Sequence, residues 1–150
     1  MAYVEAAVVV YLRAIYYPHG FAFPLAPMAP DTVAIEIGRE AATLVMLLGV
    51  AMLAGTERRD RFLTFWVSFG VWDLFYYVWL WLLVGWPPSL LTWDVLFLIP
   101  VPWTGPVLAP VTVSILLVVG GLLLWTKGAR GEPVRFPIPL RILALTGALL

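Results

Sequence analysis

The chain has 150 residues, of which 63% are hydrophobic and only 12% are charged. Soluble domains are about 45–50% apolar and about 25% charged, so this composition indicates an integral membrane protein. The formal net charge is zero, which gives no reason to expect a nucleic-acid partner. The chain has no cysteine and one histidine. Disulfides, thiolate metal sites, iron–sulfur clusters, cysteine nucleophiles and paired-histidine haem ligation are therefore excluded within this chain.

The first hydrophobic segment, residues 2–17, is short for a transmembrane helix. Its helical length of roughly 24 Å is less than a hydrocarbon core of about 30 Å. Tyrosines near both ends resemble the interfacial anchors of a spanning helix. Glu5 and Arg13 favour instead a helix that lies in the plane of the headgroups. Both interpretations stay open, and the lack of a basic start argues against a cleavable signal peptide.

Three further segments are long enough to cross a bilayer, which takes about 20 residues. They cover residues 32–54, 62–85 and 104–125. In the last of them, the pair Gly120–Gly121 suits a close approach of another helix. We therefore predict an all-α, polytopic membrane protein that forms a single domain over residues 1–150.

The segment between the second and third long spans, residues 86–103, contains prolines near both ends. Its apolar middle, residues 90–99, is too short to cross a bilayer, so we predict an interfacial or re-entrant helix on the outer face. Ser89 or Thr92 would cap this helix, with Asp94 in its first turn, where the helix dipole favours an acid. The alternative is that Asp94 lies at the mouth of a cation path.

The C-terminal hydrophobic segment begins at Ile142 and stops at Leu150. So few residues cannot cross a bilayer. Either this segment lies in the interface or it is the start of a further transmembrane helix that the sequence does not complete. We favour the incomplete helix, because no polar residue ends the run.

The basic residues predict the orientation of the chain. They gather in two loops, residues 55–61 and 126–141, whereas residues 86–103 contain no lysine or arginine. By the positive-inside rule both basic loops are cytoplasmic. We expect the protein in a bacterial inner (plasma) membrane, with these two loops on the cytoplasmic side. The basic residues of the two loops are Arg58, Arg59, Arg61, Lys127, Arg130, Arg135 and Arg141.

A charged cluster precedes the most apolar part of the first long span. Glu36, Arg39 and Glu40 are three and four positions apart, so they share one face of a helix. They form either an outer-leaflet cluster whose long side chains reach water, or a polar site between helices. The sequence leaves both open.

Asp73 lies near the middle of the second long span and is too short to reach water along the helix. It must face the helix bundle, a partner or a water-filled cavity. Gly70 and Tyr77 share its face, and the hydroxyl of Tyr76 or Tyr77 is a candidate hydrogen-bond partner. Arg39 is a candidate ion-pair partner. Asp73 then either fixes helix packing or serves as a protonatable group on an ion path.

Known catalytic and nucleotide-binding motifs are missing from the sequence, including the GxGxxG, P-loop, HExxH and GxSxG patterns. An enzyme is therefore not favoured, and we expect no cofactor. His19 is expected in a solvated loop and not in a metal site. The candidate intramembrane polar site consists of Glu36, Arg39, Glu40, Asp73, Tyr77 and Asp94.

Two functions fit these features. The first is a non-catalytic structural or accessory subunit of a larger membrane assembly, for example an energy-transducing one. The second is an oligomeric channel or transporter that conducts protons or cations through intramembrane carboxylates, with Asp73 at mid-membrane. The expected partners are the lipid bilayer and either other protein subunits or further copies of the chain. Water reaching Asp73 distinguishes the second function from the first.

Overall fold

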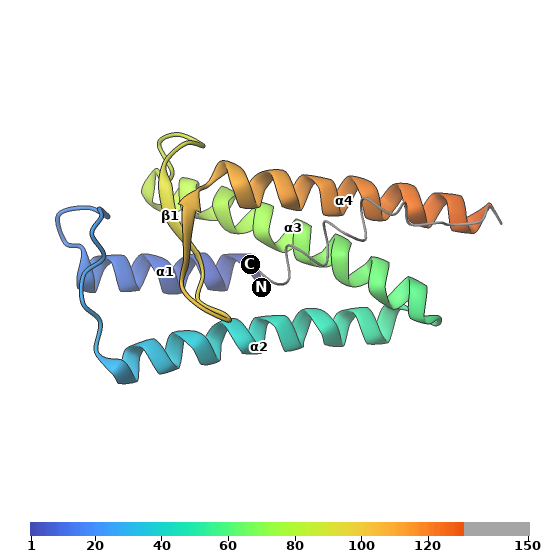
Figure 1. The fold of residues 1–150 in the computed structure, drawn as a ribbon, viewed down its shortest axis with the longest axis horizontal. Helices are drawn as coiled ribbons and strands as arrows, with labels where there is room; N and C mark the ends of the chain where they lie inside the picture. The colour runs from blue at the N-terminus through green and yellow to red at the C-terminus, as the bar shows by residue number, and fades with distance from the viewer. Residues whose placement is uncertain (131–150) are drawn as a thin grey trace.

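The computed structural model describes residues 1–130. This part of the chain forms four helices and a two-stranded sheet, in the order α1 (Ala2–Tyr16), α2 (Pro30–Ala54), α3 (Arg58–Val84), β1 (Trp93–Phe97), β2 (Trp103–Pro106) and α4 (Leu108–Ala129) (Figure 1). The hydrophobic C-terminal segment at residues 142–150 lies outside the described residues, as does the end of the basic loop predicted at residues 126–141.

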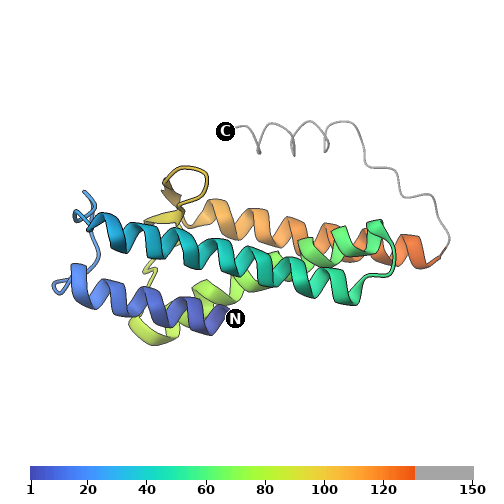
Figure 2. The same ribbon diagram turned by 90° about the horizontal axis from the view of Figure 1, so that it is seen from below.

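The helices α2, α3 and α4 are long and apolar enough to cross a membrane. The prediction of three segments that are long and apolar enough to span a membrane is therefore confirmed. Successive long helices run in opposite directions (Figures 1 and 2). The third begins at Leu108 and not at residue 104, because residues 103–106 belong to β2. We call the end of the bundle that carries the two strands the hairpin end, and the end formed by residues 55–61 and 126–130 the basic end.

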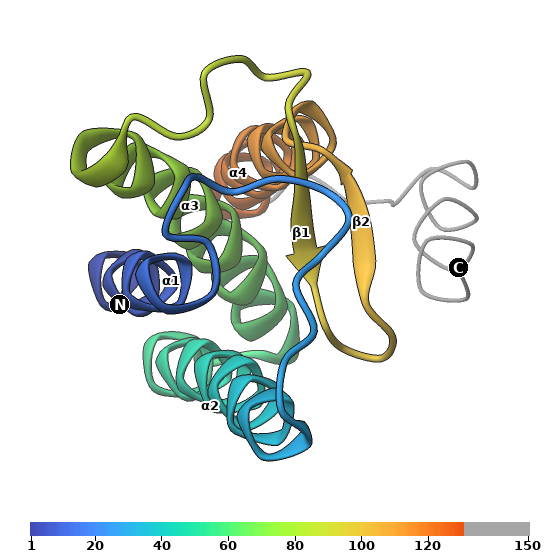
Figure 3. The same cartoon turned by 90° about the vertical axis from the view of Figure 1, so that its left-hand side faces the viewer.

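α3 is the central helix and packs against α1, α2 and α4, as the view along the bundle shows (Figure 3). Glycines permit its close approach to α4. A Cβ atom on Gly70 would lie 2.6 Å from the carbonyl oxygen of Ser114, and one on Gly121 would lie 2.7 Å from Cγ2 of Val67. Gly120, by contrast, has no neighbouring atom within 4 Å of that position. Of the glycine pair in α4, only Gly121 faces α3.

α1 has 15 residues, which gives a length of about 22 Å. It lies beside α3 in the half of the bundle near the hairpin, with its N-terminal end about midway along the bundle (Figures 1 and 2). Whether it crosses a bilayer stays a prediction. Its length leaves the other half of the α2 and α3 surface uncovered on this side.

The helix predicted within residues 86–103 is wrong, and with it the all-α class. β1 and β2 form an antiparallel hairpin in which Val95 lies opposite Thr104. β-branched and aromatic residues dominate this segment and favour extended backbone, while Pro100 and Pro102 prevent a continuous helix. The predicted capping role of Ser89 falls with the helix, and its Oγ instead accepts a hydrogen bond from the Leu91 N–H in a turn.

Candidate functional site

A cavity of about 320 Å³ lies between α1, α2, α3 and the hairpin. Its wall combines charged and aromatic side chains. The charged residues are Glu5, Arg13, Glu36, Arg39, Glu40, Asp73 and Asp94. The aromatic residues are Tyr16, Tyr17, Phe21, Trp72, Tyr76 and Phe97. Segments far apart in the sequence therefore bring charged side chains together around one cavity.

Arg13 and Asp94 form an ion pair that joins α1 to β1. Arg13 Nη2 lies 3.0 and 3.1 Å from the two carboxylate oxygens. Asp94 also accepts hydrogen bonds from Trp86 Nε1 at 3.1 Å and from the N–H of Val95 at 2.9 Å. The guanidinium carbon lies 4.4 Å from the centre of the Phe21 ring and 4.5 Å from that of Trp86, so two aromatic rings hold the cation in place.

The electrostatics of Asp94 follow from this environment. Burial raises the pKa of Asp94 above its ordinary value, and the Arg13 charge and the hydrogen bonds from Trp86 and Val95 oppose that shift. Only 3% of the side chain is exposed. The interpretation of Asp94 as a helix-capping residue is wrong, because it lies on a strand and neutralises an arginine.

Arg39 connects α2 to α1. It donates through Nε and Nη2 to Glu36, each at 2.9 Å, and forms an ion pair with Glu5. The hydroxyl of Thr43 donates a hydrogen bond to Glu5. Glu5 and Glu36 are both buried. One guanidinium thus serves two carboxylates, and the group lies between helices.

Glu40 connects α2 to the hairpin. Its two carboxylate oxygens lie 3.1 and 2.9 Å from the backbone nitrogen of Leu98, which donates to them. This contact satisfies a donor just beyond the end of β1. Within residues 1–130 no arginine, lysine or histidine lies within 4.0 Å of its carboxylate. Glu40 is therefore a buried acid without an ion-pair partner.

Asp73 faces α4 and the cavity. Its partner is the Ser114 hydroxyl, which donates to Asp73 Oδ2 at 2.8 Å. The predicted partnership with Arg39 is wrong, because that guanidinium is engaged by Glu5 and Glu36. Tyr77 is buried but does not line the cavity, whereas Tyr76 does. Within residues 1–130 Asp73, like Glu40, has no cation within ion-pair distance.

The cavity carries more acids than bases. Five carboxyl groups and two guanidinium groups line it, which leaves an excess of three negative charges when all are ionised. The indole Nε1 of Trp72, which also lines the cavity, is fully buried and has no acceptor within residues 1–130. The carboxyl groups in excess of the guanidinium groups, and the indole Nε1 of Trp72, are the groups of this site that a ligand could pair with.

Sequence reasoning placed five of the cavity residues in its candidate list and missed Glu5 and Arg13. In the sequence, these two charges favour a helix in the plane of the headgroups over a spanning one, without deciding between them. The spacing of the α1 residues that line the cavity carries the missing signal. They follow at intervals of four, three, one and three positions, which defines one face of a helix. They are Glu5, Val9, Leu12, Arg13 and Tyr16.

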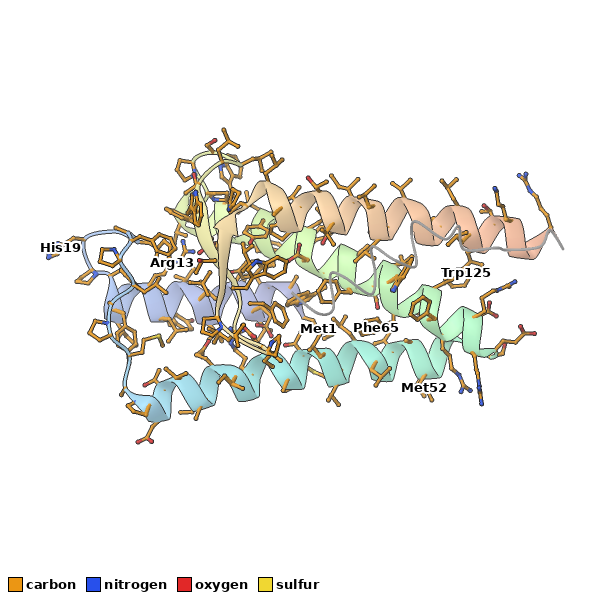
Figure 4. The ribbon with its side chains drawn as sticks, viewed as in Figure 1. Met1, Arg13, His19, Met52, Phe65 and Trp125 are labelled. Atoms are coloured by element: carbon orange, nitrogen blue, oxygen red, sulfur yellow. The ribbon has the colours of Figure 1, made fainter. Side chains whose placement is uncertain are left out.

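His19 is exposed in the loop after α1 and lies at the outer edge of the hairpin end, whereas Arg13 points into the bundle (Figure 4). The described residues contain no group of three or more potential ligands that could hold a metal ion. Comparisons with models of protein families, with curated proteins and with solved structures found no match for this chain.

Proposed function

We propose that this protein binds a small organic cation, such as a protonated amine, in the cavity between α1, α2, α3 and the hairpin. The excess of carboxyl groups over guanidinium groups on the cavity wall carries this proposal. Unpaired charges are expensive in a membrane protein away from water. A cation that enters the cavity offsets that excess and pairs with Asp73 and Glu40, the two acids of the wall that have no cationic partner within residues 1–130.

The size and walls of the cavity support an organic cation over a bare ion. Its volume of about 320 Å³ falls within the range of about 300–1,000 Å³ that small-molecule sites occupy. Aromatic rings attract cations through their faces. Phe21 already holds Arg13 together with Trp86. The other aromatic residues of the wall remain for a ligand, and they are Tyr16, Tyr17, Trp72, Tyr76 and Phe97.

The charged residues that line the cavity lie in the half of the bundle near the hairpin end. This position limits how the protein could carry a bound cation across a membrane. Toward the basic end, α3 and α4 pack closely at Gly121 and Val67, and Leu63 is fully buried. This packing favours a binding site over a continuous pore within residues 1–130. We infer that transport of the bound cation needs a change of conformation, a partner subunit or further copies of this chain.

The positive charge of the basic end predicts how the chain is oriented in the membrane. The positive-inside rule supports a cytoplasmic basic end in a bacterial inner membrane, with the hairpin end and the cavity toward the outside. The chain has no cysteine, so single cysteines can be introduced for labelling. A membrane-impermeant maleimide should label His19→Cys in intact cells and Glu57→Cys only after lysis. The reverse pattern would contradict this orientation.

A second candidate is an accessory subunit of a larger assembly, in which the polar clusters only hold the elements together. One observation favours it. Each of the five carboxyl groups on the cavity wall has at least one donor within the described residues. The clusters can therefore be stable without a ligand.

A thermal unfolding experiment separates the two candidates. The full chain is purified in detergent and heated with benzylammonium or with benzyl alcohol, its neutral analogue of similar shape. A cation site predicts that benzylammonium alone raises Tm, because a ligand at about 100 times its Kd stabilises by about 2.7 kcal/mol. Equal effects of both compounds, or no effect of either, would contradict the cation site.

A further inference from the structure

A second hollow lies between α2 and α3 toward the basic end, in the half of the bundle that α1 does not cover. This groove has a volume of about 500 Å³. Its wall is apolar, with Val45, Leu48 and Met52 from α2 and Phe65 from α3, and Arg58 and Arg61 also line it. Figure 4 shows Met52 and Phe65 in this half of the bundle.

Arg58 and Arg61 both have N–H groups that find no acceptor within residues 1–130. Arg61 donates through Nε to the carbonyl oxygen of Gly55 at 3.0 Å, which leaves its terminal nitrogens without a partner in residues 1–130. Arg58 is exposed and has no hydrogen bond or ion pair with the described residues. Arg59, by contrast, is paired with Asp60 at 3.1 Å. The pair at the groove can therefore bind an anion.

The basic end as a whole attracts anions. Among the described residues it carries five cationic side chains, Arg58, Arg59, Arg61, Lys127 and Arg130, and two acidic ones, Glu57 and Asp60. Arg58 and Arg61 lie in the first turn of α3. A spanning helix enters the bilayer at this level, so these guanidinium groups lie where lipid phosphates lie.

We propose that this groove binds an anionic phospholipid, with its phosphate on Arg58 and Arg61 and an acyl chain along Leu48, Met52 and Phe65. Guanidinium groups match the geometry of phosphate oxygens, and basic pockets between transmembrane helices bind anionic headgroups. A free phosphate would leave the apolar wall exposed. A second copy in the same orientation would bring two positively charged basic ends together.

Native mass spectrometry of the detergent-purified full chain tests this proposal. The chain is mixed with equal amounts of phosphatidylglycerol and phosphatidylcholine of identical acyl composition. We expect one retained phosphatidylglycerol and a preference over phosphatidylcholine of about thirtyfold, given two arginines near the headgroup. Equal retention of both lipids would overturn the proposal, as would a protein dimer that carries no lipid.

Three variants locate the site. Arg58→Gln with Arg61→Gln should abolish the preference. Lys127→Gln with Arg130→Gln removes the same charge from the same end but outside the groove, and should preserve it. Leu48→Trp fills the apolar part and should weaken retention of both lipids with all charges intact. An equal loss in the two charge variants, or wild-type retention in Leu48→Trp, would contradict a lipid in this groove. Unchanged helicity by circular dichroism shows that each variant is folded.

Discussion

Arg13 and Asp94 are a buried ion pair that joins the first helix to the hairpin across 81 positions of sequence. Arg13→Gln removes the positive charge and leaves the buried Asp94 carboxylate without its counter-ion. Breaking one partner of a buried pair costs about 3–5 kcal/mol. We therefore expect a loss of that size in the free energy of unfolding, measured by denaturation in mixed micelles.

The matched control for this prediction is Arg59→Gln at the basic end. Arg59 pairs with Asp60 but is 37% exposed, and exposed pairs contribute at most about 1 kcal/mol. The double variant Arg13→Gln with Asp94→Asn should lose less than the sum of its single variants, because neither charge is left unpaired. Additive losses would show that the two side chains do not interact.

The pH dependence of stability provides a second test of Asp94. Burial raises its pKa, with Arg13 as the main opposing group. A carboxyl group whose pKa is higher in the folded state binds more protons when folded, so its contribution to stability is greatest below the ordinary pKa and falls as pH rises through the folded-state value. Arg13→Gln should raise the pKa of Asp94 further and extend this fall to higher pH. The extension should vanish when Asp94→Asn is added, as measured by unfolding at a series of pH values.

At residue scale the sequence indicated which residues are polar at membrane depth but not their partners. The position of Asp73 near the middle of an apolar span predicted that it faces protein, and the contact with Ser114 agrees. Its partner could not be predicted, because the rotation and depth of α2 relative to α3 decide whether Arg39 reaches it. The position of Glu5 in the sequence gives no indication that it pairs with Arg39 of α2.

At the scale of elements, the contact between α3 and α4 depends on Gly70. A Cβ atom there would lie 2.6 Å from a backbone oxygen of α4. Gly70→Ala should therefore push the helices apart and lower the free energy of unfolding by about 1–3 kcal/mol. Gly120→Ala, where nothing lies within 4 Å, should not destabilise, since alanine favours a helix over glycine. Thermal unfolding of both variants checks this, and equal losses would contradict the packing.

The long helices could be predicted because length and apolar composition alone define a span. The hairpin could not, since a short apolar run does not distinguish helix from strand. Val95, Phe97 and Thr104 have strand-forming side chains, but their pairing depends on a turn that contains two prolines. The contact of Glu40 with the N–H of Leu98, which connects α2 to the hairpin, joins residues 58 positions apart and leaves no local trace in the sequence.

At the scale of the whole molecule, the protein has two unlike ends. The hairpin end holds a cavity lined by more carboxyl groups than guanidinium groups. The basic end holds an apolar groove beside Arg58 and Arg61, whose terminal nitrogens have no partner in residues 1–130. On our proposals, the first site takes a cationic solute and the second an anionic lipid.

Isothermal titration of benzylammonium into the full chain tests the cation site most directly. We predict that the wild type binds one cation, and that Asp73→Asn weakens binding by at least about tenfold, since a hydrogen bond to a charged group contributes about 1.5–3 kcal/mol. Asp60→Asn, which removes the same charge far from the cavity, should bind as the wild type does. A wild type without measurable binding, or an Asp73→Asn variant of wild-type affinity, would contradict the cation site.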